Sequence, residues 1–334
     1  MGKYTAIGGQ ALIEGIMMKS PEKTALAVRM PDKNIDITYL EDKSIKEKIK
    51  FLKLPVIRGV VTFIESMIQG YKAMMISADK SGFTDIEEED EKPISDKKKN
   101  AIISAVMIIG TVLGVALSVV LFMALPRYAV SLFGLIFRTD LRKVALGPAI
   151  EQIIKLAIFV GYVYIVSLTK DIKRVFMYHG AEHKTIFCYE KGLPLTVENV
   201  RFQKRFHPRC GTSFLILMIL VSIIFSIIIQ LIFPGVYKIA WLWIIVKILM
   251  IPIVCGAGYE VLKACGKYDN LFIRIISAPG LWLQRITTKE PADDMIEIAI
   301  AALKACEPAV PDVDRSVDKE ILKEENTDND ANDI

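Results

Sequence analysis

Two long stretches without charged residues constrain the fold of this chain more than any other feature. Residues 101–125 and 213–233 supply 25 and 21 consecutive positions without Asp, Glu, Lys or Arg. Since about 20 predominantly apolar residues are enough for a helix to cross the hydrocarbon core of a bilayer, each stretch predicts a transmembrane helix. The two stretches exclude both an ordinary soluble domain and a disordered chain.

Two further apolar segments, at about 148–169 and 239–257, are also predicted to cross the membrane. The sequence therefore predicts an α-helical polytopic membrane protein with about four transmembrane helices, a small N-terminal β element and cytosolic loops. The predicted helices form two transmembrane hairpins, over residues 101–169 and 213–257.

The distribution of Lys and Arg predicts the orientation. The cytosolic loop 170–212 carries nine of them and three more, at 97–99, directly precede the first span, whereas the turn after the third span has only Lys238. The four Lys and Arg residues in loop 126–147 oppose this difference between the two sides. Because Lys and Arg accumulate on the cytoplasmic side, we expect a multi-pass plasma-membrane protein with both termini in the cytosol. The net charge of +4 is too small to predict specific DNA binding.

Residues 1–43 are predicted to form a small β meander. Three short runs of residues that favour β-strands, at 12–18, 24–30 and 35–39, are separated by turn residues. Side chains alternate between the faces of a strand, so Gln10 and Glu14 are predicted to point the same way. They could line a site beneath the histidine-bearing segment described below, or lie on a solvated sheet face.

Residues 44–79 are predicted to form an amphipathic helix. Its polar residues step by four and three positions and form one stripe, at Arg58, Thr62, Glu65, Gln69 and Lys72. Such a helix can lie in the membrane interface, pack against the bundle, or cross as a polar-striped span, and the sequence leaves these options open.

The remaining segments lie outside the membrane. Residues 80–100 read as a charged linker, because an acidic run is followed by three lysines. Residues 258–306 read as a membrane-surface and helical segment, in which Pro279-Gly280 interrupts an apolar stretch and Pro291 begins a final helix. Residues 307–334 hold ten acidic and three basic side chains with little apolar content, which predicts a disordered acidic tail.

All three histidines fall in the loop 170–212, and two of them, His179 and His183, are four positions apart. On a helix both imidazoles face the same way and can bind one divalent metal ion, with zinc the best match. Glu182 completes the H-x-x-E-H pattern of inverted zincins, in which the carboxylate acts as the catalytic base. This pattern predicts a metal site.

A third metal ligand is required, and the sequence offers three candidates. His207 and Cys210 share the loop with the histidine pair, and Glu260 follows the last predicted span on the same side of the membrane. Arg209, beside Cys210, could stabilise developing negative charge during catalysis.

These residues support alternative readings. With an open coordination position the site would belong to a metal-dependent hydrolase at the cytosolic membrane face. A closed structural zinc would instead belong to a non-enzymatic membrane biogenesis or assembly factor, with four ligands: His179, His183, His207 and Cys210. The histidines could also simply hydrogen-bond within the fold.

A run of basic residues in the same loop suggests partners beyond the lipid bilayer itself. Its members are Arg201, Lys204, Arg205 and Arg209. They could attract anionic lipid headgroups or dock a membrane-protein or ribosomal partner, or they could only satisfy the charge bias of cytoplasmic loops.

Several longer motifs resemble one family. They are Gly8-Gly9-Gln10-Ala11, Glu14-Gly15-Ile16-Met17-Met18, Arg58-Gly59-Val60-Val61, Tyr178 to Lys184, His207 to Phe214, Tyr259-Glu260 and Ala278 to Trp282. Over about residues 4–306 the chain resembles the YqhQ-like family of bacterial multi-pass membrane proteins, a domain of unknown function regarded as a predicted metal-dependent enzyme. The resemblance implies a membrane location and a metal site, and it implies no substrate.

Overall fold

The computed structural model describes residues 7–41, 45, 49–83, 96–136, 147–207, 210–267 and 270–307. Parts of the predicted charged linker, of the loop after the first span and of the acidic tail lie outside these ranges, and so does Arg209.

The N-terminal β element is a four-stranded antiparallel sheet with its strands in chain order. The strands are β1 (Gly8–Leu12), β2 (Gly15–Lys19), β3 (Thr24–Arg29) and β4 (Ile35–Leu40). The prediction of one strand over 12–18 was wrong, because the chain turns between β1 and β2. Glu14 lies in this turn with a φ of 50°, a left-handed conformation that ends a strand.

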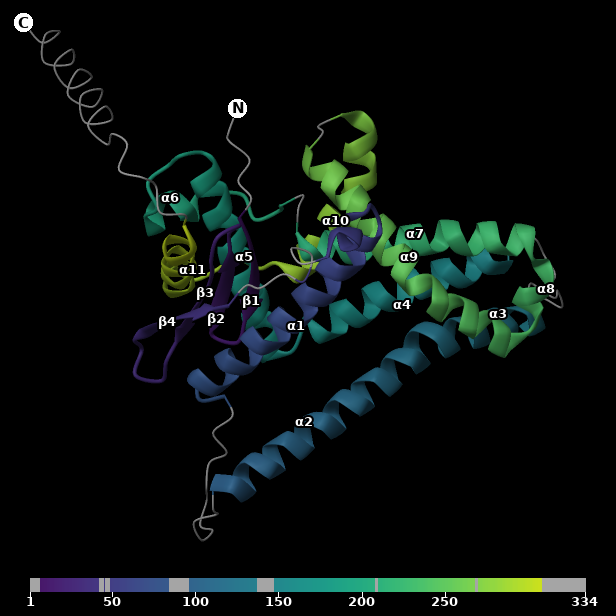
Figure 1. The fold of residues 1–334 in the computed structure, drawn as a ribbon, viewed down its shortest axis with the longest axis horizontal. Helices are drawn as coiled ribbons and strands as arrows, with labels where there is room; N and C mark the ends of the chain where they lie inside the picture. The colour runs from purple at the N-terminus through teal and green to yellow at the C-terminus, as the bar shows by residue number, and fades with distance from the viewer. Residues whose placement is uncertain are drawn as a thin grey trace, which may run out of the picture.

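The rest of the described chain is helical. Helices α1 (Ile57–Lys80), α5 (Lys170–Glu190) and α11 (Asp293–Cys306) contact the sheet, and α6 (Val197–Arg201) packs on α5 and α11. Segment η2 (Lys50–Lys53) packs on α1, and α10 (Leu271–Thr287) packs mainly on α7. The other helical segments are α2 (Asp96–Val119), η3 (Val120–Ala124), α3 (Leu125–Ile136), α4 (Gly147–Val166), α7 (Gly211–Ile232), α8 (Pro234–Lys238) and α9 (Ala240–Lys267). Figure 1 shows the sheet with α5, α6 and α11 on one side of the molecule and α3, α4, α7 and α9 on the other.

Both faces of the sheet are covered by helices. Ile16 and Met18 point into the core that α11 and α5 share with the sheet, whereas Met17 and Leu26 pack with Ala73 of α1. The alternation of strand side chains thus builds two thin hydrophobic layers. One of them fixes the position of α5, the helix that carries His179 and His183.

Helix α1 packs against the sheet and α9 through one of its faces, which agrees with one of the options left open for this segment. Small residues permit close approach near its start and in its middle, because a Cβ at Gly59 would lie 3.0 Å from Gly256 and a Cβ at Gly70 would lie 2.3 Å from the Gln10 side chain. The helix therefore connects the sheet to α9.

Three helical stretches are long and apolar enough to cross a membrane, or four if the bent pair α4 and α5 counts as one span. The three are Ile109–Ile136, Gly211–Ile232 and Trp241–Ala264, and α4 and α5 meet at an angle of 99°. The chain is thus a mostly helical protein with three or four candidate spans and a small N-terminal sheet.

Two candidate spans differ from their predicted bounds. The first runs past residue 125 to Ile136. The π-helical turn η3 precedes Pro126, and it accommodates this proline, which has no N–H to donate, without ending the helix. The last continues to Ala264 and encloses Glu260, which was expected to follow the span. Helix α10 likewise continues through Pro279, where an interruption was expected.

Candidate metal centre

The histidine pair lies on a buried segment of α5. His179 and His183 are 9% and 1% exposed, and their ring centroids are 4.4 Å apart, as the i, i+4 spacing predicts. Gly180 lets another chain segment approach the helix closely, since a Cβ there would lie 2.0 Å from the carbonyl oxygen of Lys289. That segment also donates a hydrogen bond from the Lys289 N–H to the Phe176 carbonyl.

Cys210 joins the two histidines in one cluster. The possible ligand atoms of His179, His183 and Cys210 all lie within 4.8 Å of one another. The Nε2 atom of His179 lies 3.0 Å from the Sγ atom of Cys210. The Nε2 atom of His183 is buried and has no hydrogen-bond partner within the described part of the chain. A buried ring nitrogen without a partner is costly, and a metal ion would satisfy it.

Backbone carbonyls fix the orientation of both imidazoles. The Nδ1 atom of His179 lies 2.8 Å from the Thr287 oxygen, and that of His183 contacts the Arg205 oxygen. A carbonyl oxygen can only accept, so each Nδ1 donates, and in the neutral form of the ring Nε2 is then the nitrogen with the lone pair. Metal-binding histidines commonly donate such a hydrogen bond through the ring nitrogen that does not bind the metal.

The electrostatics favour the ligand forms of these side chains. Burial and the neighbouring His179 lower the pKa of His183, which keeps its imidazole neutral. Burial raises the pKa of the Cys210 thiol, but the charge of His183 in its protonated form and contacts with Thr212 outweigh burial and lower this pKa. Cys210 is the N-cap of α7 and accepts from the Thr212 N–H at 3.4 Å, a position that stabilises a thiolate.

Glu182 lies beside the cluster in a fully enclosed place. Burial raises the pKa of Glu182 to about 8; His179 and a hydrogen bond from the Gly9 backbone lower it, and Cys210 raises it further. Its Oε2 atom is buried without a hydrogen-bond partner among the described residues. A Cβ at Gly9 would lie 2.9 Å from the Glu182 side chain, so the strand can approach because Gly9 has no side chain.

Two of the predicted ligands lie outside the cluster. His207 is buried beside Glu190, with 3.7 Å between Nε2 and Oε2, and Gln284 holds its backbone through two hydrogen bonds of 2.7 Å. Glu260 accepts from Arg58 at 2.7 and 2.5 Å and thereby ties α9 to α1. The ligand atoms that come together among the described residues are those of His179, His183 and Cys210.

We expected Glu14 and Gln10 to point to the same face of the sheet, and the structure shows that they do not. Glu14 lies in the turn and pairs with Arg174 of α5, and it also accepts from the Tyr178 hydroxyl at 3.0 Å. Gln10 lies against Gly70 of α1. The strand residue that does reach the site is Gly9, through its backbone. The Gly8-Gly9 pair could have indicated such a close approach, because glycine has no side chain.

The basic run is partly neutralised within the fold. Arg201 forms an ion pair with Asp293, and Arg205 lies 3.4 Å from Glu290. These contacts attach the segment after α6 to the start of α11. They leave less free positive charge for lipid headgroups than the sequence alone suggests.

The donor set suits a divalent transition metal. Two neutral imidazoles and one thiolate form a borderline-soft set of the kind that binds zinc. The Nε2 atom of His183, which has no hydrogen-bond partner among the described residues, and the lowered pKa of Cys210 both agree with such a ligand role.

The fold and the site define a helical protein with candidate membrane spans and a buried His-His-Cys cluster beside a carboxyl group. The chain belongs to the family described as "Protein of unknown function (DUF1385)", which matches residues 54–309. It is 38% identical over 299 residues to the "Uncharacterized protein YqhQ" of Bacillus subtilis (strain 168), covering 88% of this chain and 90% of that protein. The resemblance to the YqhQ-like family is thereby confirmed. No solved structure matches the chain significantly.

Proposed function

We propose that this protein is a metal-dependent hydrolase of the plasma membrane, with its site at the cytosolic membrane face. The observation that supports this proposal most is the clustering of His179, His183 and Cys210 around a position beside Glu182. A zinc ion bound there would supply a Lewis acid that polarises a carbonyl or phosphoryl oxygen.

The number of ligands favours catalysis over a structural role. Catalytic zinc sites have three protein ligands and one open position, whereas structural sites are closed by four. The fourth ligand of the closed alternative, His207, lies beside Glu190, and its ring centroid is 5.6 Å from that of His183. Three ligands therefore describe the cluster better than four.

Glu182 has the properties of a general acid and base. A pKa of about 8 allows the carboxyl group to hold and release a proton near neutral pH, which is where proton transfer is most effective. The hydrogen bond from the Gly9 backbone N–H orients the carboxyl group of Glu182. Oε2, which lacks a partner among the described residues, is the atom that would exchange the proton with the reacting group.

The position of the cluster suggests a substrate at or in the bilayer, such as a lipid or a membrane peptide. Cys210 immediately precedes the candidate span Gly211–Ile232, so the cluster lies at one end of that helix. The excess of Lys and Arg in the segment 170–212 supports a cytosolic location for this end and for both termini.

The test begins with the metal content of the detergent-purified full chain. We expect about one zinc per chain in the wild type and a loss of zinc in the double variant His179→Ala/His183→Ala. The cobalt-substituted protein should show a thiolate-to-cobalt absorption band, and Cys210→Ser should abolish it. Absence of metal from the wild type after zinc is resupplied would refute the hydrolase.

A second step separates the hydrolase from the assembly factor. Acetohydroxamate binds to an open coordination position, and it should change the visible spectrum of the cobalt protein. Glu182→Gln should keep the metal, because Glu182 is not a ligand. An unchanged spectrum would indicate a closed site and would support the assembly factor with structural zinc.

A further inference from the structure

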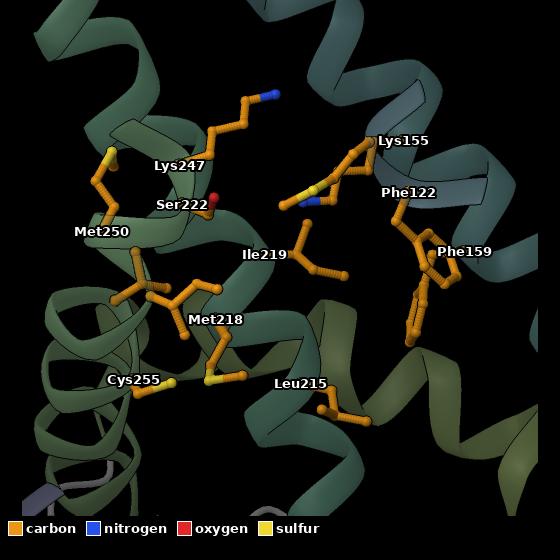
Figure 2. Close-up of a pocket in the computed structure, with 13 residues that line it drawn as sticks. Phe122, Lys155, Phe159, Leu215, Met218, Ile219, Ser222, Lys247, Met250 and Cys255 are labelled. Carbon is orange, nitrogen blue, oxygen red and sulfur yellow. The ribbon is translucent and has the colours of Figure 1, made fainter. Parts of the chain in front are cut away.

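A cavity of about 310 Å³ lies between the candidate spans. It is lined by α4, α7, α9 and the π-helical segment η3, and none of the residues of the candidate metal centre lines it. Figure 2 shows Lys155 and Lys247 with Ser222 at one end of the cavity, and Leu215 and Cys255 at the other end. The cavity thus has one charged end and one apolar end.

Two lysines and one carboxylate lie at the charged end, and only one of the lysines is paired with the carboxylate. The Lys247 Nζ atom lies 2.5 Å from the Oε1 atom of Glu151, whose side chain is only 3% exposed. Lys155 lies close enough to feel the charges of both Lys247 and Glu151. Among the described residues, no carboxylate lies within ion-pair distance of Lys155 itself. With both lysines protonated, the three side chains together carry one positive charge in excess.

An excess charge at this place requires a balancing partner. Charged side chains within candidate spans are costly and mark binding or transport sites. The remaining wall is formed by apolar side chains from four helical segments, among them Phe122, Phe159, Met218 and Ile219. A ligand that fits these surroundings carries one negative charge and an apolar body.

The direction of the cavity fits a lipid-like molecule. Lys155 and Lys247 follow the starts of α4 and α9 by eight and seven residues, about 10–12 Å along the helix axes. Figure 1 shows α3 and α8, which precede these starts, at the end of the bundle away from the sheet. The charged end therefore faces that end of the bundle, and the apolar end points towards the sheet.

We propose that this cavity binds an apolar monocarboxylate of the fatty-acid class, with its carboxylate between Lys155 and Lys247 and its chain along α7 towards Leu215. The volume is at the lower end of the range of about 300–1,000 Å³ for small-molecule pockets. That size suits a single acyl chain, and it does not accommodate the two chains of a membrane phospholipid.

The experiment measures binding of radiolabelled decanoate to the full chain in phosphatidylcholine nanodiscs. We expect saturable binding at one site per chain. Lys155→Met, which keeps the length of the side chain and removes its charge, should weaken binding about tenfold or more, since one partner of a desolvated charge pair is lost. Lys155→Arg should retain binding, and so should Lys170→Met, which alters an exposed lysine at the start of α5.

The outcomes separate charge recognition from simple partitioning. Absence of saturable binding, or equal binding by Lys155→Met and the wild type, overturns the proposal. Competition by decanol as strong as that by unlabelled decanoate shows that the carboxylate is not recognised, and it also overturns the proposal. A loss of binding in Lys155→Arg as large as that in Lys155→Met overturns it too. Saturable binding of radiolabelled phosphatidylglycerol without binding of decanoate overturns the proposal and assigns the cavity to bilayer phospholipid instead. The zinc content should be the same in all these variants, so the result is independent of the proposed hydrolase.

Discussion

The Nε2 atom of His179 lies 3.0 Å from the Sγ atom of Cys210, although 31 positions separate them in the chain. The contact joins the middle of α5, which packs on the sheet, to the first turn of α7, which is a candidate span. The His-His-Cys cluster therefore forms only when the sheet part and the helical bundle are correctly assembled.

Glu182→Gln should stabilise the metal-free protein at neutral pH. Folding raises the pKa of Glu182 from its ordinary value of 4.5 to about 8, so the folded chain keeps a proton that the unfolded chain releases. The wild type loses stability as the pH rises from about 4.5 to 8, whereas glutamine stays neutral. At pH 7 the free energy of unfolding should be higher in the variant by about 3 kcal/mol.

The measurement for Glu182→Gln is denaturant unfolding of the chelator-treated protein between pH 4 and 8. The difference between variant and wild type should vanish below about pH 4.5 and grow as the pH rises. A difference that is constant over this range would contradict the raised pKa.

Gly9→Ala should disturb the site from the sheet side. The added methyl group would lie 2.8 Å from the Met17 oxygen and 2.9 Å from the Glu182 side chain, so one of them must move. We expect a loss of about 1–3 kcal/mol in stability and weaker metal binding. Gly8→Ala is the matched control, because a Cβ there meets nothing within 4 Å. Equal effects of the two variants would refute this explanation.

Glu260→Gln should leave the metal content unchanged. The carboxylate of Glu260 is engaged with Arg58 at 2.7 and 2.5 Å, and it lies outside the ligand cluster. The expected defect is a loosened contact between α1 and α9, seen as a lower melting temperature, and Arg58→Gln should produce the same defect. In a double-mutant cycle the two losses should not add. Loss of zinc in Glu260→Gln alone would make this residue a ligand.

Cysteine labelling should place the two ends of the bundle on opposite sides of the membrane. In a chain whose native cysteines are replaced, Lys23→Cys lies in the exposed turn between β2 and β3, and Gly235→Cys lies in α8. With the proposed orientation, a membrane-impermeant maleimide added to intact cells reacts with Gly235→Cys only. Labelling of Lys23→Cys from outside would reverse the orientation.

Several features followed from the sequence because they depend on neighbouring residues alone. The length and lack of charge that a membrane span needs are local properties, so α7 was predicted within two residues of its bounds. The i, i+4 spacing of His179 and His183 likewise places both rings on one face of any helix. Strands β3 and β4 were predicted from their turn residues in the same way.

The tertiary structure decided which distant residue meets the histidine pair. His207, Cys210 and Glu260 were equally acceptable ligands by chemistry, and only the packing of α5 against the start of α7 brings Cys210 to them. The approach of Gly9 to Glu182 depends in the same way on how the sheet lies against α5. The residues of the chain thus determined the candidate spans and the helix face that carries the two histidines. The third member of the cluster was determined by long-range packing, which no local pattern of apolar and polar residues encodes.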